Sequence, residues 1–120
     1  MDLSSQRQYI QRARNVTVDL TTTSETLLYT APSGDDFDFV VIESILVTED
    51  GGQQTQIDVT NTHGSDTFNL FSGKVISANS TSELLERPII IHADEIIKVQ
   101  GNHAGNLDIH MSIVEYAKGD

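Results

Sequence analysis

The sequence contains no cysteine and no tryptophan, and it has no long hydrophobic run. Without cysteine the chain forms no disulfide and uses no thiolate chemistry. No apolar stretch approaches the roughly 20 residues that a helix needs to cross a bilayer. Residues 1–15, MDLSSQRQYIQRARN, lack the apolar core of a signal peptide, so we expect no secretory signal.

Basic residues are also scarce, with seven Lys and Arg against 18 Asp and Glu, for a net charge of −11. Such a surface repels phosphate backbones, which argues against nucleic-acid binding by most of the chain. The charge is unevenly placed. Arg7, Arg12 and Arg14 against Asp2 give residues 1–14 a charge of +2, which leaves −13 for the remainder.

Short runs with an apolar residue at every second position dominate the 120 residues. Examples are NVTVDLT (15–21), TQIDVTN (55–61) and LDIHMSI (107–113). This period of two is typical of half-buried strands, and clusters of Gly, Asn, Asp and Ser mark the turns between them. We predict about eight strands in one antiparallel β-sandwich, jelly-roll-like, with SANSTSE (77–83) as a longer crossing between sheets.

Two runs, FVVIESILVT (39–48) and RPIIIHA (87–93), are apolar at consecutive positions instead. One interpretation is a strand covered on both faces, by the core on one side and by a partner on the other. The alternative is a β-bulge that switches the inward face partway along the strand. The sequence does not separate the two.

The N-terminal residues are set apart as a short basic arm (1–14), followed by the β-sandwich domain (15–120). Residues 4–14 are the best candidate for one or two helical turns, but the apolar stripe is thin and an extended arm fits equally well. The arm is either a frayed, soluble terminus or a segment that docks onto an acidic partner, and in the second case it supplies our candidate interaction residues. Arginine and tyrosine are enriched at interface hot spots, and these residues are Arg7, Tyr9, Ile10, Arg12 and Arg14.

Three carboxylates, Asp35, Asp36 and Asp38, crowd the stretch TAPSGDDFD. Carboxylates at alternate loop positions can bind calcium, but this stretch lacks the fuller Asp-x-Asp-x-Asp-Gly loop with a distal Glu. We interpret the preceding Pro-Ser-Gly as a turn whose exit the aspartates keep solvated. Their sharper alternative role is to dock basic groups, such as the arm of an adjacent copy.

The other potential metal-binding and catalytic motifs of the sequence give no indication of an active site. The four histidines have no helical zinc-ligand spacing and no cysteine to join them, although a metal shared across a symmetry axis would need only one histidine per subunit. No Gly-x-Ser-x-Gly elbow and no glycine-rich phosphate loop occur. We therefore predict no catalytic residue, no metal site and no cofactor, and we expect the protein not to be an enzyme.

Several stretches resemble the small all-β structural proteins of tailed bacteriophages. They are VDLTTTSETLLYTAPSGDDFDFVVIESILVTE, TQIDVTN, RPIIIHADEIIKVQG and LDIHMSIVEY. The pattern is TLLYTAP before a turn and a long apolar strand, then an apolar run leading into AD-II-V, and it covers about residues 15–116. The resemblance implies a non-catalytic virion component, often trimeric, and it transfers no functional residue to this chain.

The leading hypothesis from this resemblance is a capsid cement or decoration protein on the capsid exterior, where it stabilises capsomer junctions. The expected partners are other copies in a homotrimer and the major capsid protein or other virion proteins, with no membrane. Nucleic acid is not the expected partner, and contact with it by the basic arm alone is a minor alternative. One alternative is a neck, tail or fibre accessory protein. Another is a carbohydrate-binding β-sandwich, which the absence of tryptophan weakens.

Overall fold

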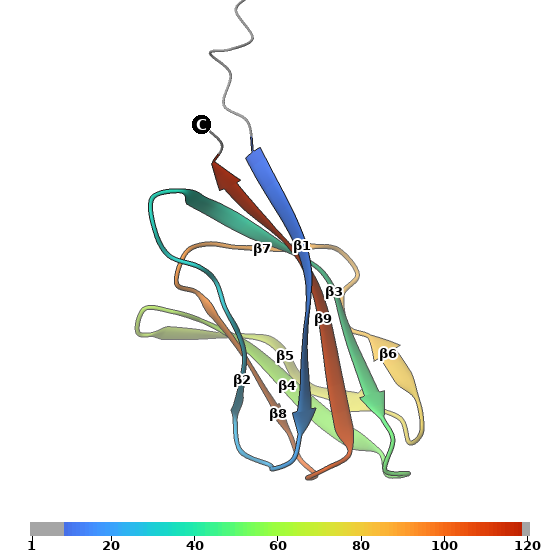
Figure 1. Ribbon diagram of the computed structural model, residues 1–120. Coiled ribbons are helices and arrows are strands. Elements are labelled where there is room, and N and C mark those ends of the chain that lie inside the picture. The colour runs from blue at the N-terminus through green and yellow to red at the C-terminus, as the bar shows by residue number, and fades with distance from the viewer. Residues whose placement is uncertain (1–8, 119–120) are drawn as a thin grey trace, which may run out of the picture.

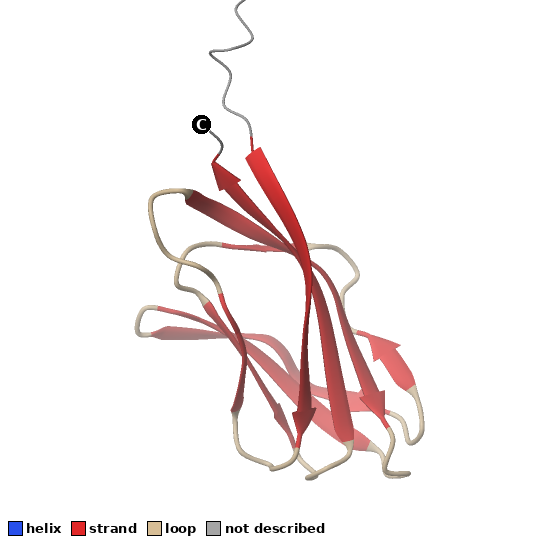
Figure 2. Ribbon diagram, in the orientation of Figure 1, coloured by secondary structure: helices blue, strands red, loops and turns tan. Residues whose placement is uncertain are grey.

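The computed structural model describes residues 9–118, which form nine β-strands and no helix (Figures 1 and 2). No helix that could span a membrane is therefore found in this part of the chain. The strands are β1 (Tyr9–Leu20), β2 (Thr26–Thr30), β3 (Phe37–Glu49), β4 (Thr55–His63), β5 (Asp66–Ile76), β6 (Thr81–Glu83), β7 (Ile89–Ile91), β8 (Ile96–Gly101) and β9 (Leu107–Lys118).

The strands form two sheets with nested pairing. Sheet A has the order β1-β9-β3, with β6 and β7 on successive stretches of the far edge of β3, and sheet B has the order β2-β8-β4-β5. Strand β4 pairs with β5, β3 with β6 and β7, β2 with β8, and β1 with β9, always antiparallel. The chain is thus one long hairpin rolled into two facing sheets, which is the double Greek key of a jelly roll.

The predicted fold class, an antiparallel and jelly-roll-like sandwich, is confirmed. The structure has nine strands where the sequence indicated about eight, because β6 and β7 divide one strand position between them. Strand β6 lies within the predicted crossing SANSTSE, which does lead from sheet B to sheet A. Its three residues are too few to show a period-two pattern.

The hydrophobic core lies between the sheets and follows the predicted alternation. Along β9, Leu107, Ile109, Met111 and Ile113 are at most 1% exposed, while the residues between them face outward. Burying a side chain of this kind contributes roughly 1.5–3 kcal/mol relative to leaving it in water. The inward stripes of the two sheets therefore hold the sandwich together.

A bulge in β3 explains why the first of the two non-alternating runs has no simple period. Val40 and Ile42 are fully buried, Glu43 is the extra residue of the bulge, and Ile45 and Val47 are fully buried beyond it. Since adjacent residues of a strand face opposite ways, one extra residue moves the inward set from even to odd positions. The predicted bulge is therefore confirmed for this run, but Val41 and Leu46 also make its outer face apolar, so a partner covering that face stays a prediction.

The loops at the end of the molecule opposite the start of β1 are organised by a buried carboxylate. Glu49, at the end of β3, is 1% exposed and accepts backbone N–H groups from Gly51, Gly52, Gln53 and Asn79 at 2.8–3.1 Å. Burial alone would raise the pKa of Glu49, but these four hydrogen bonds outweigh it and hold the pKa below its ordinary value.

Candidate assembly site at the start of strand β1

Strand β1 contains most of the predicted arm. It pairs with β9 without a break, from Tyr9 opposite Lys118 to Leu20 opposite Leu107, and it is an edge strand of sheet A. The boundary predicted between residues 14 and 15 therefore falls inside a strand, and the stretch considered for a short helix is extended from Tyr9 onward. Residues 1–8, including the predicted site residue Arg7, lie outside the described residues.

Two of the predicted site residues, Arg12 and Arg14, bind a carboxylate of their own chain. Arg12 donates through Nε to Glu115 Oε1 at 2.9 Å, and its second guanidinium nitrogen lies 2.8 Å from the same oxygen. Arg14 donates to Glu115 Oε2 at 3.2 Å. Tyr29 of β2 donates its hydroxyl to Oε2 at 2.5 Å, so one carboxylate links β1, β9 and sheet B.

Only the carboxylate at the centre of this network is buried. The side chain of Glu115 is only 5% exposed, whereas those of Arg12 and Arg14 are 67% and 45% exposed. Burial alone would raise the pKa of Glu115, but the Tyr29 hydroxyl and the two guanidinium groups hold that pKa below its usual range. Burial, reinforced by the neighbouring carboxylate, raises the pKa of Tyr29. The pair therefore stays an anion and a neutral donor at neutral pH.

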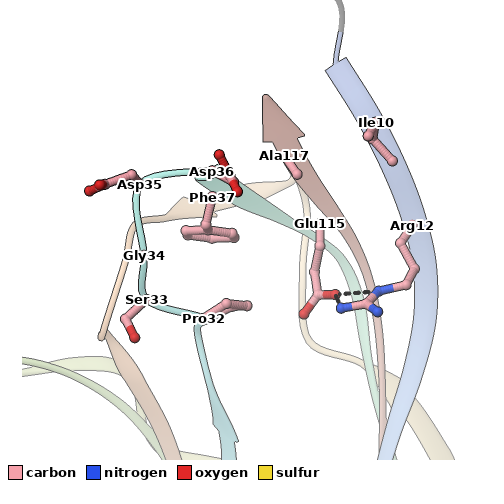
Figure 3. A pocket seen from close by; sticks show the side chains of 10 residues that line it. All are labelled: Ile10, Arg12, Pro32, Ser33, Gly34, Asp35, Asp36, Phe37, Glu115 and Ala117. Carbon is pink, nitrogen blue, oxygen red and sulfur yellow. Dashed lines mark hydrogen bonds and ion pairs between the residues drawn. The ribbon is translucent and has the colours of Figure 1, made fainter. Parts of the chain in front are cut away.

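A hollow of about 380 Å³ opens beside this network (Figure 3). One wall carries Ile10, Arg12 and Glu115, and the opposite side is the corner between β2 and β3, where the Phe37 ring points into the hollow. Figure 1 shows the start of β1 and the end of β9 extending past the strands of sheet B, which leaves the inner face of sheet A uncovered here. Ile10 is 62% exposed as a result.

The corner itself is the acidic stretch that the sequence singled out. Gly34 has a φ of 114°, a conformation that glycine adopts at no steric cost, so it forms the turn that was predicted. Asp35 and Asp36 are exposed; in Figure 3 the Asp35 carboxylate points away from the hollow, whereas the Asp36 side chain extends toward Ala117 at its rim. Asp38 is the extra residue of a second bulge in β3 and is half-buried. The structure thus brings the acidic corner and the basic strand of one copy to opposite sides of one hollow.

Within residues 9–118, no group of three or more His, Asp or Glu side chains is placed to hold a metal ion. His63 Nδ1 lies 3.2 Å from Glu95, and His103 Nε2 lies 3.3 Å from the side-chain amide of Gln53. In the wall of the hollow, both oxygens of Glu115 accept hydrogen bonds, so this carboxylate is not poised to act as a base.

Sequence reasoning missed Glu115 and Tyr29, although one signal was present. Glu115 is the next member of the inward stripe that runs through Ile113, so its position in the period-two pattern already pointed into the core. A carboxylate at such a position requires partners, because a buried charge without them is costly. The pattern could not say that the partners come from β1 and β2.

Comparison with known proteins gives similarity of fold alone. No protein-family model matches this sequence, and no curated protein matches it significantly. A chain in a solved structure of Bacillus endospore appendages, described as a novel family of disulfide-linked pili, matches with a TM-score of 0.57 and 13% identity over 96% of this chain and 94% of that one. At this identity the match shows a shared fold, and the cysteine-free sequence rules out disulfide linkage for the present chain.

A second match is to a chain in the structure of infectious bursal disease virus, Gx strain. It has a TM-score of 0.43 and 7% identity, and it covers 95% of this chain but only 31% of the viral one.

Proposed function

We propose that this protein is a non-enzymatic structural protein of a virion, acting as a capsid cement or decoration protein on the outer capsid surface. The observation behind the proposal is that Ile10 is 62% exposed and lines a hollow at the start of β1. The jelly-roll fold and the resemblance to small phage structural proteins support it. Docking would bury Ile10 against a capsid subunit and stabilise the junction between capsomers.

Arg12 and Arg14 already bind Glu115 of their own chain, so they are poor candidates for contacts with a capsid subunit. Their first role is to hold β1 onto β9 and β2, so removing residues 1–14 would damage the sandwich as well as any docking. Ile10 is exposed and takes no part in these ion pairs, so it can be substituted while they are kept. The sharp test therefore uses a deletion of residues 1–8 and, separately, Ile10→Asp.

The assay is co-sedimentation with purified capsids of the virus that encodes the protein. We expect wild type to bind and both variants to bind much less. Leu27→Asp is the matched control, because Leu27 is 56% exposed on sheet B, far from this end. Equal binding by wild type and both variants would contradict the proposed docking surface. The number of copies per virion distinguishes a capsid cement protein from a neck, tail or fibre accessory protein. Hundreds of copies are expected on the capsid, and three to about a dozen at the neck, tail or fibres.

A second candidate function, carbohydrate binding, is favoured by one observation on sheet B. A hollow of about 360 Å³ is lined by amide, hydroxyl and carboxylate groups, which suit sugar hydroxyls. They are Thr23, Gln56, Asp58, Gln100 and Asn102. No aromatic ring lines it for stacking. Calorimetry with soluble glycans, with and without calcium, tests this candidate, and heat that is lost in Asp58→Ala would support it.

A further inference from the structure

Two polar hollows on the outer face of sheet B join into one groove. The first, of about 360 Å³, is the candidate carbohydrate site. The second has a volume of about 240 Å³. Asp58 of β4 and Gln100 of β8 line both hollows, and they lie directly opposite each other in the strand register. The two hollows are therefore neighbours that meet at this pair.

The second hollow lies over three adjacent strands of sheet B. Thr60 of β4 lies opposite Lys98 of β8 on one side and opposite Asn69 of β5 on the other. Val59 is fully buried in the core, so its neighbours Asp58 and Thr60 face outward, because successive residues of a strand face opposite sides. Three polar side chains from three strands thus lie in one row along this hollow.

The hydroxyl of Thr60 is the feature that points to a ligand. Thr60 lines the second hollow and is only 9% exposed. Its Oγ1 atom is buried and forms no hydrogen bond within residues 9–118. A buried hydroxyl without a partner is unfavourable, and buried polar groups of folded proteins nearly always have one. A hydroxyl of a ligand in the second hollow would supply the missing partner.

The lining of the groove matches the hydrogen bonding of sugar hydroxyls. A sugar hydroxyl both donates and accepts, so it pairs well with amides and hydroxyls, which do the same, and with carboxylates, which accept from it. The amides and hydroxyls that line the groove include Gln56, Asn69, Gln100, Asn102, Thr60 and Thr67. Such closely spaced polar groups suit a ligand with a hydroxyl on successive carbon atoms.

Contacts with the backbone hold two of these side chains in place. The N–H of Gly73 donates to Asp58 Oδ1 at 2.6 Å, and Gln100 Nε2 donates to the carbonyl oxygen of Thr23 at 2.9 Å. The second carboxylate oxygen of Asp58 and the side-chain oxygen of Gln100 are left to accept from a ligand. Groups that are already ordered bind a ligand at a lower entropic cost than mobile ones.

Other classes of ligand fit this groove less well. Strands β4 and β8 are interior strands with a neighbour on each side, so their backbones are not open to pairing with an extended peptide. Anions are repelled by Asp58 and by the net charge of −11, and Lys98 is already paired with Glu25 at 3.5 Å. Residues 9–118 hold no cluster of His, Asp or Glu suited to a metal ion. A neutral polyhydroxy ligand remains.

We propose that the groove binds a neutral oligosaccharide, with one sugar unit in each hollow and with Thr60 as a hydrogen-bonding residue of the second. The proposal rests on the candidate carbohydrate function and extends it from one hollow to two. It does not depend on docking to a capsid through Ile10. Among the described residues, no aromatic ring lines either hollow, so we expect a weak Kd of about 1 mM for a free disaccharide.

The first test asks whether the full chain binds neutral glycans at all. It uses an array of immobilised neutral oligosaccharides of glucose, galactose, mannose and N-acetylglucosamine, beside sialylated and sulfated glycans. Dense immobilisation strengthens weak binding through avidity. We expect binding to at least one neutral glycan and weaker binding to the acidic ones. Binding to none of them, or a preference for the acidic glycans, would overturn the inference.

The second test uses Thr60→Val, which preserves the shape of the side chain and removes its hydroxyl. The neutral oligosaccharide that binds best on the array is titrated into each protein and followed by amide NMR. In wild type it should shift resonances of β4 and β8, and Thr60→Val should raise the Kd about tenfold. Because this hydroxyl has no partner in the protein, Thr60→Val should keep or raise Tm. Thr17→Val, at an exposed position of sheet A, is the matched control and should bind like wild type.

The outcomes separate this inference from the functions proposed above. An unchanged Kd in Thr60→Val, or shifts confined to strands other than β4, β5 and β8, would overturn the assignment of the second hollow. If Asp58→Ala abolishes binding while Thr60→Val does not, the carbohydrate candidate stands with one hollow and the two-hollow groove fails. Capsid binding is measured with Ile10→Asp and purified capsids, so that proposal stands or fails on other data.

Discussion

Replacing Glu115 by glutamine is the most direct test of the network that ties β1 to the sandwich. The substitution preserves the shape of the side chain and removes its charge. A buried hydrogen bond to a charged group contributes about 1.5–3 kcal/mol, which applies to Tyr29, whereas pairs with exposed arginines contribute roughly 0.2–1 kcal/mol each. Glutamine retains one acceptor oxygen, so we expect a loss of about 2 kcal/mol, or about 8 °C in Tm for a chain of this size.

The stabilisation by the Glu115 carboxylate should depend on pH in a defined direction. The pKa of Glu115 is lower in the folded protein than in the unfolded chain, where it is about 4.3. The carboxylate therefore stabilises the fold fully above the unfolded value, and this contribution is lost as the pH falls through the folded pKa. The difference in Tm between wild type and Glu115→Gln should accordingly be constant near neutrality and shrink in acid.

Thermal unfolding followed by circular dichroism measures both quantities. Glu86→Gln is the control, since Glu86 is exposed in a loop and should change stability by less than about 0.5 kcal/mol. Tyr29→Phe completes a double-mutant cycle, in which we expect a coupling of about 1 kcal/mol with Glu115→Gln. The reasoning is refuted if Glu115→Gln behaves like the control, or if the two substitutions are simply additive.

Three further predictions concern other parts of the fold. Asp108→Asn should raise stability at pH 7 by up to about 1 kcal/mol, because like charges opposite each other in a sheet are unfavourable, and the gain should vanish in acid as wild type takes up a proton. Glu49→Gln should lower Tm at pH 7, with the difference shrinking in acid, since its carboxylate organises two loops. Deleting Glu43 should abolish folding, as judged by circular dichroism, because Ile45 and Val47 would turn outward, while Glu43→Ala should fold normally.

The strands of this protein could be predicted where one face meets water and the other meets the core. Residues 107–113 alternate without exception, and their buried positions agree with that pattern. Where β3 has bulges at Asp38 and Glu43, the pattern becomes ambiguous, because the period of two is interrupted while the residues stay apolar. The three-residue strands β6 and β7 are too short to have a period of their own.

The candidate site was predicted only in part. The composition of residues 1–14 marked Arg12, Arg14 and Ile10, but it suggested an arm free to bind a partner. In the structure Arg12 and Arg14 contact Glu115 at sequence separations of 103 and 101 residues, a pairing that depends on which strands become neighbours. The predicted role of Arg7 and Tyr9 in docking stays a prediction. The local sequence shows the charge of a segment, but it does not show which distant residues become its neighbours in the folded protein.

The sequence by itself determined the fold class, the inward stripes, the glycine turn before the aspartates and the uneven charge, because each of these depends on neighbouring residues in the chain. Only the tertiary structure decided that Glu115 holds the basic strand and that one end of sheet A projects beyond sheet B. It also aligned Lys98, Thr60 and Asn69 into one outward row on sheet B. These features arise from strand order and register between segments far apart in the sequence, which no local pattern encodes.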